Sequence, residues 1–122
     1  MLKRAKNPPA VSGLGVDLAE VARVRRLAAN PRFLKRVFTP GELAYAAQSK
    51  NKFERLAARF AVKEAVIKAL DAAALPLNSI EVENTPSGSP RVSVKGRPGL
   101  RLLVSISHTA AYAVAAVIAF EA

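Results

Sequence analysis

The chain has no cysteine and no tryptophan, and aromatic residues make up only 6% of its 122 positions. The absence of cysteine excludes disulfides, thiolate metal sites and a cysteine nucleophile. No apolar run is long enough to cross a bilayer, because Gly13, Gly15 and Asp17 interrupt the first one and residues 110–120 are too few. We therefore expect a soluble, cytoplasmic protein whose chemistry relies on oxygen and nitrogen groups.

The composition is otherwise that of one globular domain, with 51% hydrophobic and 23% charged residues. Nineteen Lys and Arg against nine Asp and Glu give a net charge of +10. Such a charge attracts nucleic acids, anionic membranes, phosphorylated ligands or acidic proteins, and it does not choose among them. Residues 1–10 are basic, contain a proline pair and lack periodicity, so we predict a flexible tail before a domain at 11–122.

Hydrophobic periodicity predicts one strand and then helices in the first half of the chain. The glycine-punctuated run from residue 11 indicates a buried strand that ends at Asp17, followed by an amphipathic helix over 19–30. After further helical turns at 33–38, Thr39 and Glu42 fit a capping box with proline at the first helical position. The longest predicted helix covers residues 53–70, which contain neither glycine nor proline.

The second half of the chain changes to a period of two, which is typical of strands. Residues 79–84 and 91–95 flank a Pro/Gly turn and predict a hairpin. A second strand pair is predicted at 100–107 and 112–120. Helices followed mostly by strands favour a single α+β domain with an antiparallel sheet packed on the long helix.

Two acidic residues stand at positions where a charge needs an explanation. Glu64 falls on the apolar face of the long helix, and a carboxylate there is costly unless it is paired or binds a cation. Its ordinary partner would be Lys68, one turn further along the helix. Asp17 lies between a strand and a helix, where it would ordinarily be an N-cap completed by Glu20.

The alternative is that Asp17 and Glu64 meet across the core and share one divalent cation. Mg²⁺ fits this arrangement, since it takes one or two protein carboxylates and completes its shell with water and phosphate oxygens. Arg59, Lys63 and Lys68 lie close to Glu64 in the sequence and would add positive charge for a phosphorylated ligand.

His108 is the single histidine and stands at the end of a predicted strand. It is either a structural hydrogen-bond donor or part of a functional loop, and nothing around it supports a serine nucleophile. A one-signed basic run is the other notable feature: it is either a solvated helix face or a docking surface for an acidic partner. Its members are Arg23, Arg25, Arg26, Arg32, Lys35 and Arg36.

Taken together, these segments resemble the holo-acyl-carrier-protein synthases, the short, single-domain type of 4'-phosphopantetheinyl transferase. The resemblance extends from about residue 11 to residue 120, and its blocks keep their order and spacing. The blocks are GLGVDLAEVAR at 13–23, FTPGE at 38–42, RLAARFAVKEAVIKAL at 55–70, PSGSP at 86–90 and VSISHTAAYAVA at 104–115. The sequence departs from the family in its basic start and at 71–74, where members commonly have glycines.

The resemblance implies the phosphopantetheinyl transferase fold and an Mg²⁺-dependent enzyme of fatty acid biosynthesis. Such an enzyme transfers the 4'-phosphopantetheine arm of coenzyme A to a serine of apo acyl carrier protein and releases adenosine 3',5'-bisphosphate. It implies metal binding by Asp17 and Glu64, and a homotrimer with active sites between subunits. We expect Lys68 to steady the phosphate or Glu64. The serine proton would go to Glu64 or to a water on the metal, and the sequence does not distinguish these.

The remaining basic residues are assigned to substrate binding on the same resemblance. Arg59, Lys63 and His108 are the candidates for holding coenzyme A phosphates, including the 3'-phosphate. Carrier proteins of this kind are acidic, so a basic docking face would attract them. This face is assigned to the run between residues 23 and 36, with Arg23, Arg25 and Arg26 at its start.

A non-catalytic module that binds RNA or DNA through the +10 charge is the competing hypothesis. The few aromatic residues and the absence of a known nucleic-acid motif count against it. We therefore expect neither a specific nucleic acid nor a membrane as a partner.

Overall fold

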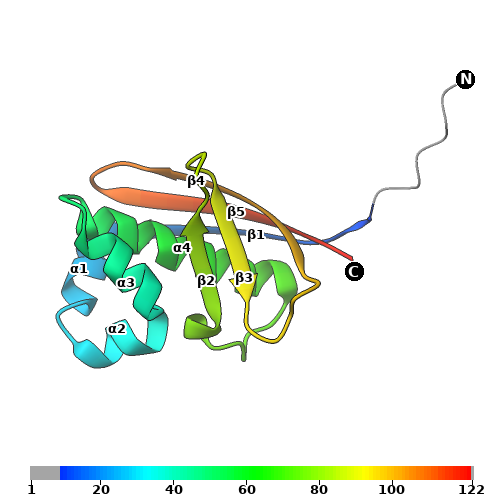
Figure 1. Ribbon diagram of the computed structural model, residues 1–122, viewed down its shortest axis with the longest axis horizontal. Coiled ribbons are helices and arrows are strands. Elements are labelled where there is room, and N and C mark those ends of the chain that lie inside the picture. The colour runs from blue at the N-terminus through cyan, green and yellow to red at the C-terminus, as the bar shows by residue number, and fades with distance from the viewer. Residues whose placement is uncertain (1–8, 122) are drawn as a thin grey trace, which may run out of the picture.

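A long helix packed on an antiparallel sheet forms the centre of the computed structural model, which describes residues 9–121 (Figure 1). The tail predicted at 1–10 therefore lies almost entirely outside the described residues. The main sheet has the order β1-β5-β4, and a separate two-stranded sheet consists of β2 and β3. The elements are β1 (Val11–Glu20), α1 (Val21–Leu27), α2 (Pro31–Val37), α3 (Pro40–Ala47), α4 (Lys52–Leu70), a 3₁₀ turn (Leu77–Ser79), β2 (Ile80–Asn84), β3 (Pro90–Val94), β4 (Arg101–His108) and β5 (Tyr112–Phe120).

The predicted fold class is confirmed, as are the long helix, both strand pairs and the capping box. Thr39 Oγ1 accepts from the Glu42 amide at 3.2 Å, while the Glu42 carboxylate accepts from the Thr39 amide at 2.9 Å. The predicted boundary at Asp17 is wrong. β1 continues to Glu20 because it pairs with β5 as far as the Glu20–Tyr112 pair, so α1 starts only at Val21.

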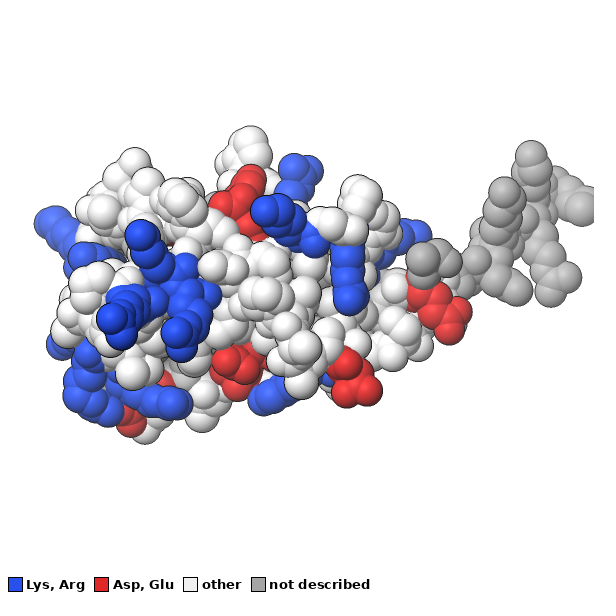
Figure 2. Space-filling model, turned by 90° about the horizontal axis from the view of Figure 1, so that it is seen from below, with Lys and Arg blue, Asp and Glu red and all other residues white. Residues whose placement is uncertain are grey.

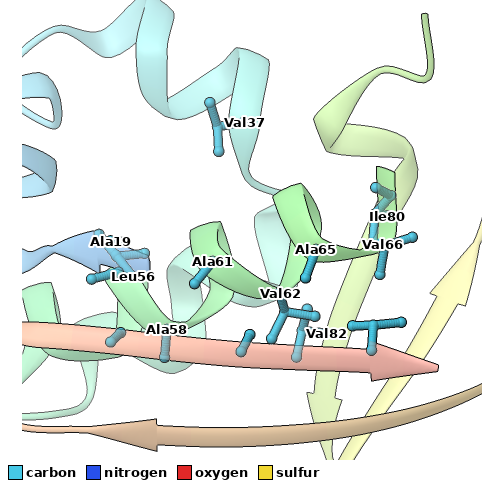
Figure 3. Packing of buried hydrophobic residues seen from close by; sticks show 14 of the residues in the cluster. Ala19, Val37, Leu56, Ala58, Ala61, Val62, Ala65, Val66, Ile80 and Val82 are labelled. Carbon is cyan, nitrogen blue, oxygen red and sulfur yellow. The ribbon is translucent and has the colours of Figure 1, made fainter. Parts of the chain in front are cut away.

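Small residues bring α4 unusually close to β1. Gly13 and Gly15 face α4 so closely that an added Cβ would lie 1.7 Å from Ala69 O and 1.9 Å from Ala65 O. Ala57, Ala61 and Ala65 are fully buried on the helix side. Ala61 and Ala65 belong to the same hydrophobic cluster as Leu56 and Val62 (Figure 3). Only glycine permits this spacing, since every other side chain would overlap the helix backbone.

Helix α4 ends without the glycines that are common at 71–74 in the family that the sequence resembles. Asp71 adopts the left-handed conformation, with φ of 50°, that glycine most often supplies after a helix. The amides of Asp71 and Ala72 donate to the carbonyls of Lys68 and Ile67. The helix is therefore closed by its own backbone despite the different sequence at 71–74.

Among residues 9–121, the outer face of the main sheet carries exposed apolar side chains. The large hydrophobic side chains that are exposed among the described residues all lie on β1, β4 and β5: Val11, Leu14, Val16, Leu18, Leu103, Tyr112 and Val114. A continuous exposed apolar face of this kind marks an interaction surface. Among residues 9–121, no helix is both long and apolar enough to span a bilayer.

Candidate active site

Asp17 and Glu64 line the same pocket, which we call the carboxylate pocket. It has a volume of about 260 Å³, and Arg23, Phe60 and Glu20 are among its other lining residues. Asp17 reaches it from β1, and Glu64 reaches it from α4. The close packing of β1 on α4 through Gly15 and Ala65 therefore places two acids that are distant in sequence side by side.

The structure contains neither the N-cap predicted for Asp17 nor the ion pair predicted between Glu64 and Lys68. Asp17 lies inside β1, and the N-cap of α1 is Glu20, which makes no side-chain capping bond. The ammonium of Lys68 pairs with Asp17 Oδ1 at 3.1 Å and donates to the Val16 carbonyl at 2.8 Å. Among residues 9–121, no cation lies within 4.0 Å of the Glu64 carboxylate, so Lys68 is the partner of Asp17 rather than of Glu64.

The charged form of Glu64 is disfavoured in this pocket. Partial burial, followed by the charge of Asp17, raises the pKa of Glu64 above its ordinary value, while Lys68 and Arg23 oppose the shift. The described residues contain no group of three or more acidic or histidine side chains placed to hold a metal ion. Two carboxylates nevertheless fit Mg²⁺, which commonly binds one or two and fills its other positions with water and phosphate oxygens.

A second pocket of about 320 Å³, the arginine pocket, gathers positive charge around an aromatic ring. The guanidinium carbons of Arg55 and Arg59 lie 4.6 and 4.4 Å from the centre of the Tyr45 ring. Asn84 donates to the Tyr45 hydroxyl at 3.0 Å and lies 3.5 Å from Arg59, and His108 also lines the pocket. Paired guanidiniums in a partly enclosed site are suited to binding a phosphate.

Arg59 itself lacks a full set of partners. Its side chain is buried, and its Nε has no hydrogen-bond acceptor among the described residues. Burial lowers the pKa of Arg59, and the charges of Glu42 and Tyr45 oppose this shift. An anionic ligand in the arginine pocket would offset the cost of burying this guanidinium.

Arg55, Tyr45 and Asn84 are site residues that sequence reasoning missed. Arg55 had a usable signal, because two arginines one helical turn apart repel each other unless an anion or a ring lies between them. Tyr45 and Asn84 had no sequence signal for a binding role, since only the tertiary structure brings α3 and the end of β2 to this face of α4.

The two pockets open at opposite edges of the main sheet. Asp17 on β1 pairs with Ala115 on β5, which pairs in turn with Ile106 on the far strand β4. Ile106 lines the arginine pocket. On α4, Arg59 and Glu64 are five residues apart, which separates their directions by about 140°. The pockets share no lining residue and face different directions.

Comparison with known proteins places this arrangement in a family. The model of the 4'-phosphopantetheinyl transferase superfamily matches residues 13–117. The holo-[acyl-carrier-protein] synthase of Thermodesulfovibrio yellowstonii is 46% identical, in a match that covers 88% of this chain and 97% of the relative. The chain belongs to the holo-[acyl-carrier-protein] synthases. This membership decides for an enzyme over a nucleic-acid-binding module.

Solved synthases share the fold over nearly the whole chain. The Bacillus anthracis synthase in complex with CoA (3',5'-ADP) superposes with a TM-score of 0.81 at 30% identity, and the match covers 92% of this chain and 98% of that one. The Helicobacter pylori synthase in complex with coenzyme A has a TM-score of 0.75 at 28% identity and covers 87% and 98%. The coenzyme is a ligand of those two proteins.

One predicted coenzyme ligand of this synthase needs correction. The Lys63 side chain is fully buried, and its ammonium pairs with the Glu42 carboxylate at 2.7 Å. It also donates to the carbonyls of Leu77 and Ile80, so its three protons are all used. Lys63 therefore cannot hold a coenzyme phosphate in this structure.

The other predicted site residues of the synthase are separated by the fold. His108 lies in the arginine pocket with Arg59, and its Nδ1 is 3.3 Å from Glu54 Oε1. Of the predicted docking residues, Arg23 lines the carboxylate pocket, whereas Arg25 lies 5.1 Å from the centre of the Phe53 ring. Arg26 is largely exposed and lies 3.9 Å from Glu20.

Proposed function

We propose that this synthase transfers the 4'-phosphopantetheine arm of coenzyme A to a serine hydroxyl of an apo acyl carrier protein. The observation that carries the proposal is the combination of a two-carboxylate pocket with a separate arginine pocket in a chain of this family. The serine oxygen attacks the phosphorus on the pantetheine side of the diphosphate. The bond from that phosphorus to the bridging oxygen breaks, and adenosine 3',5'-bisphosphate leaves.

Asp17 and Glu64 would hold Mg²⁺, with Lys68 fixing the orientation of Asp17 from the other side. When bound, the ion supplies charge neutralisation for the diphosphate oxygens. The residues of the chain do the positioning: Arg55 and Arg59 hold a phosphate of the coenzyme, and Arg23 adds positive charge at the carboxylate pocket. The serine proton is proposed to go to Glu64 or to a water held at the metal.

A mass measurement tests the activity directly. The purified synthase is mixed with coenzyme A, Mg²⁺ and an apo acyl carrier protein, and the mass of the carrier protein is then measured by mass spectrometry. A gain equal to one phosphopantetheine group on the carrier, dependent on the enzyme and on Mg²⁺, is expected. An unmodified carrier with several acidic carrier proteins would refute the proposal.

The same proposal includes a homotrimer with active sites between subunits. The two pockets share no lining residue and face different directions around α4, so we expect the two halves of one active site to come from different subunits. Head-to-tail contacts around a threefold axis would bring the β1 edge of one subunit to the β4 edge of the next, and such contacts close into a ring. The exposed apolar face of β1, β4 and β5 would then be covered at the centre.

Mixed oligomers provide a quantitative prediction for this arrangement. Glu64→Gln removes one carboxylate, and Arg59→Met removes one guanidinium, so each variant alone is expected to be inactive. When both chains are co-expressed in equal amounts, about one quarter of the intersubunit sites combine an intact carboxylate pocket with an intact arginine pocket. We expect transfer activity near that fraction of the wild type.

The matched control co-expresses Glu64→Gln with Asp17→Asn. Both changes affect the carboxylate pocket, so no mixed site is intact and activity should stay absent. Equal inactivity of the two mixtures, in oligomers shown by mass spectrometry to contain both chains, would contradict active sites between subunits.

The carrier protein is proposed to dock on the basic surface of α1 and α2. The side chains of this basic surface, Arg23, Arg25, Arg26, Arg32, Lys35 and Arg36, are all exposed. Figure 2 shows a dense group of basic side chains at the end of the molecule that α1 and α2 form. The surface adjoins the carboxylate pocket through Arg23, so a docked acidic carrier would lie next to the reacting phosphate.

Arg26→Glu is the sharper test of docking, because Arg23 also faces the carboxylate pocket. We expect KM for the carrier protein to rise about tenfold at low salt, with KM for coenzyme A unchanged, and the difference to shrink as salt screens the charges. Arg97→Glu makes the same charge change in an exposed loop and serves as the control. Equal carrier KM values in the two variants would remove α1 from the interface.

A further inference from the structure

Lys63 and Glu42 form a buried clamp on the start of β2. The Lys63 ammonium pairs with Glu42 and donates to the carbonyls of Leu77 and Ile80. The Glu42 carboxylate also accepts from the amide of Val82 at 2.8 Å, and from the amide of Thr39 at the start of α3. One ion pair therefore ties α3, α4 and β2 together at a point that solvent does not reach.

The same three elements also contribute residues to the arginine pocket, one step along each of them. Glu42 and Tyr45 are three residues apart on α3, and Lys63 and Arg59 are four apart on α4. These are the spacings that put two side chains on one face of a helix. On β2, Asn84 is two residues after Val82, whose amide binds Glu42, and Asn84 contacts both Arg59 and Tyr45.

We infer that Lys63 and Glu42 are positioning residues for the arginine pocket. They hold α3, α4 and β2 in the relative placement that lets Tyr45, Arg59 and Asn84 contact one another. Neither residue touches the coenzyme. This inference rests on the proposed function, because the arginine pocket matters to catalysis only if it binds a phosphate of the substrate.

A charged pair suits this task better than apolar packing for a geometric reason. Apolar side chains slide past one another at little cost, whereas the clamp uses hydrogen bonds of fixed direction to two carbonyls and two amides of the backbone. A buried pair of this kind adds specificity of arrangement more than stability. Loosening it should leave α4 on the sheet and release mainly α3 and β2, which supply Tyr45 and Asn84 to the arginine pocket.

The test uses the full chain carrying Lys63→Met together with Glu42→Gln, which removes both charges and leaves neither one unpaired. We expect the dissociation constant for adenosine 3',5'-bisphosphate, measured by calorimetry without metal, to rise about tenfold, and KM for coenzyme A to rise equally. We expect kcat at saturating coenzyme to stay within about twofold, because Asp17 and Glu64 are unaffected. Glu42→Asp keeps both charges and shortens the carboxylate arm by one methylene, so it replaces the double variant if the latter does not fold, with a smaller rise in both constants expected.

Val117→Ala is the matched control, since it shortens a buried side chain of β5 that lines neither pocket. It should lower the melting temperature without moving KM or the dissociation constant. The inference is overturned if the folded clamp variant binds the bisphosphate as tightly as the wild type, or if its kcat falls while KM is unchanged. Failure of the wild type to bind the bisphosphate would instead refute the proposed function.

Discussion

Glu64→Gln should abolish phosphopantetheine transfer and at the same time make the protein more stable. The loss of one of two metal-binding carboxylates removes several kcal/mol of charge stabilisation, so we expect kcat to fall at least about a thousandfold. The raised pKa of Glu64 means that its ionised form is unfavourable in the folded protein. Stability from this group is present below the unfolded pKa and is lost as the pH rises through the folded pKa.

Glutamine does not ionise, so the variant does not lose this stability as the pH rises. The melting temperature of Glu64→Gln without Mg²⁺ should therefore exceed that of the wild type at pH 7.5, and the two should converge once the pH falls below about 4, where both side chains are neutral. Transfer is followed by the mass of the carrier protein, and melting by circular dichroism. Asp17→Asn should lose transfer equally but gain no stability, because it gives up the ion pair with Lys68.

Glu121→Gln is the control for charge, since it neutralises an exposed carboxylate outside both pockets. It should keep wild-type transfer. Normal turnover by Glu64→Gln would refute the metal assignment, and a lower melting temperature at pH 7.5 would show that Glu64 stabilises the fold instead.

Gly15→Ala should strongly destabilise the fold. Its added methyl group would lie 1.9 Å from the carbonyl oxygen and 2.8 Å from the carbonyl carbon of Ala65, so β1 and α4 must separate. A single methyl group that forces backbone movement in a packed core costs about 3 kcal/mol. Because Gly15 is two residues from Asp17 and Ala65 is next to Glu64, the same movement pulls the two carboxylates apart. Urea unfolding measures the loss of stability.

Gly99→Ala is the matched control, because an added Cβ there meets nothing within 4 Å and its backbone needs no positive φ. Its free energy of unfolding should stay within about 0.5 kcal/mol of the wild type. A Gly15→Ala protein as stable as Gly99→Ala would mean that α4 does not pack on β1 at the distance described.

The site was predictable from the sequence where local patterns carried the information. Glu64 was recognisable because a carboxylate on an apolar helix face needs a cation, and Asp17 because its segment resembles a family block. Lys63 was assigned wrongly for a related reason. A lysine next to Glu64 looks available for a phosphate, and only its contacts with Glu42, Leu77 and Ile80 show that it is enclosed.

The sequence by itself determined the helices, the strand pairs and the family, because periodicity, capping and turn residues act over a few neighbouring positions. Only the tertiary structure decided that β1 runs past Asp17, that Lys68 pairs with Asp17, and that Tyr45 and Asn84 join Arg59. The physical reason is range: these contacts join residues far apart in the chain. They form only when close packing of glycine and alanine backbones sets the distance between the sheet and α4.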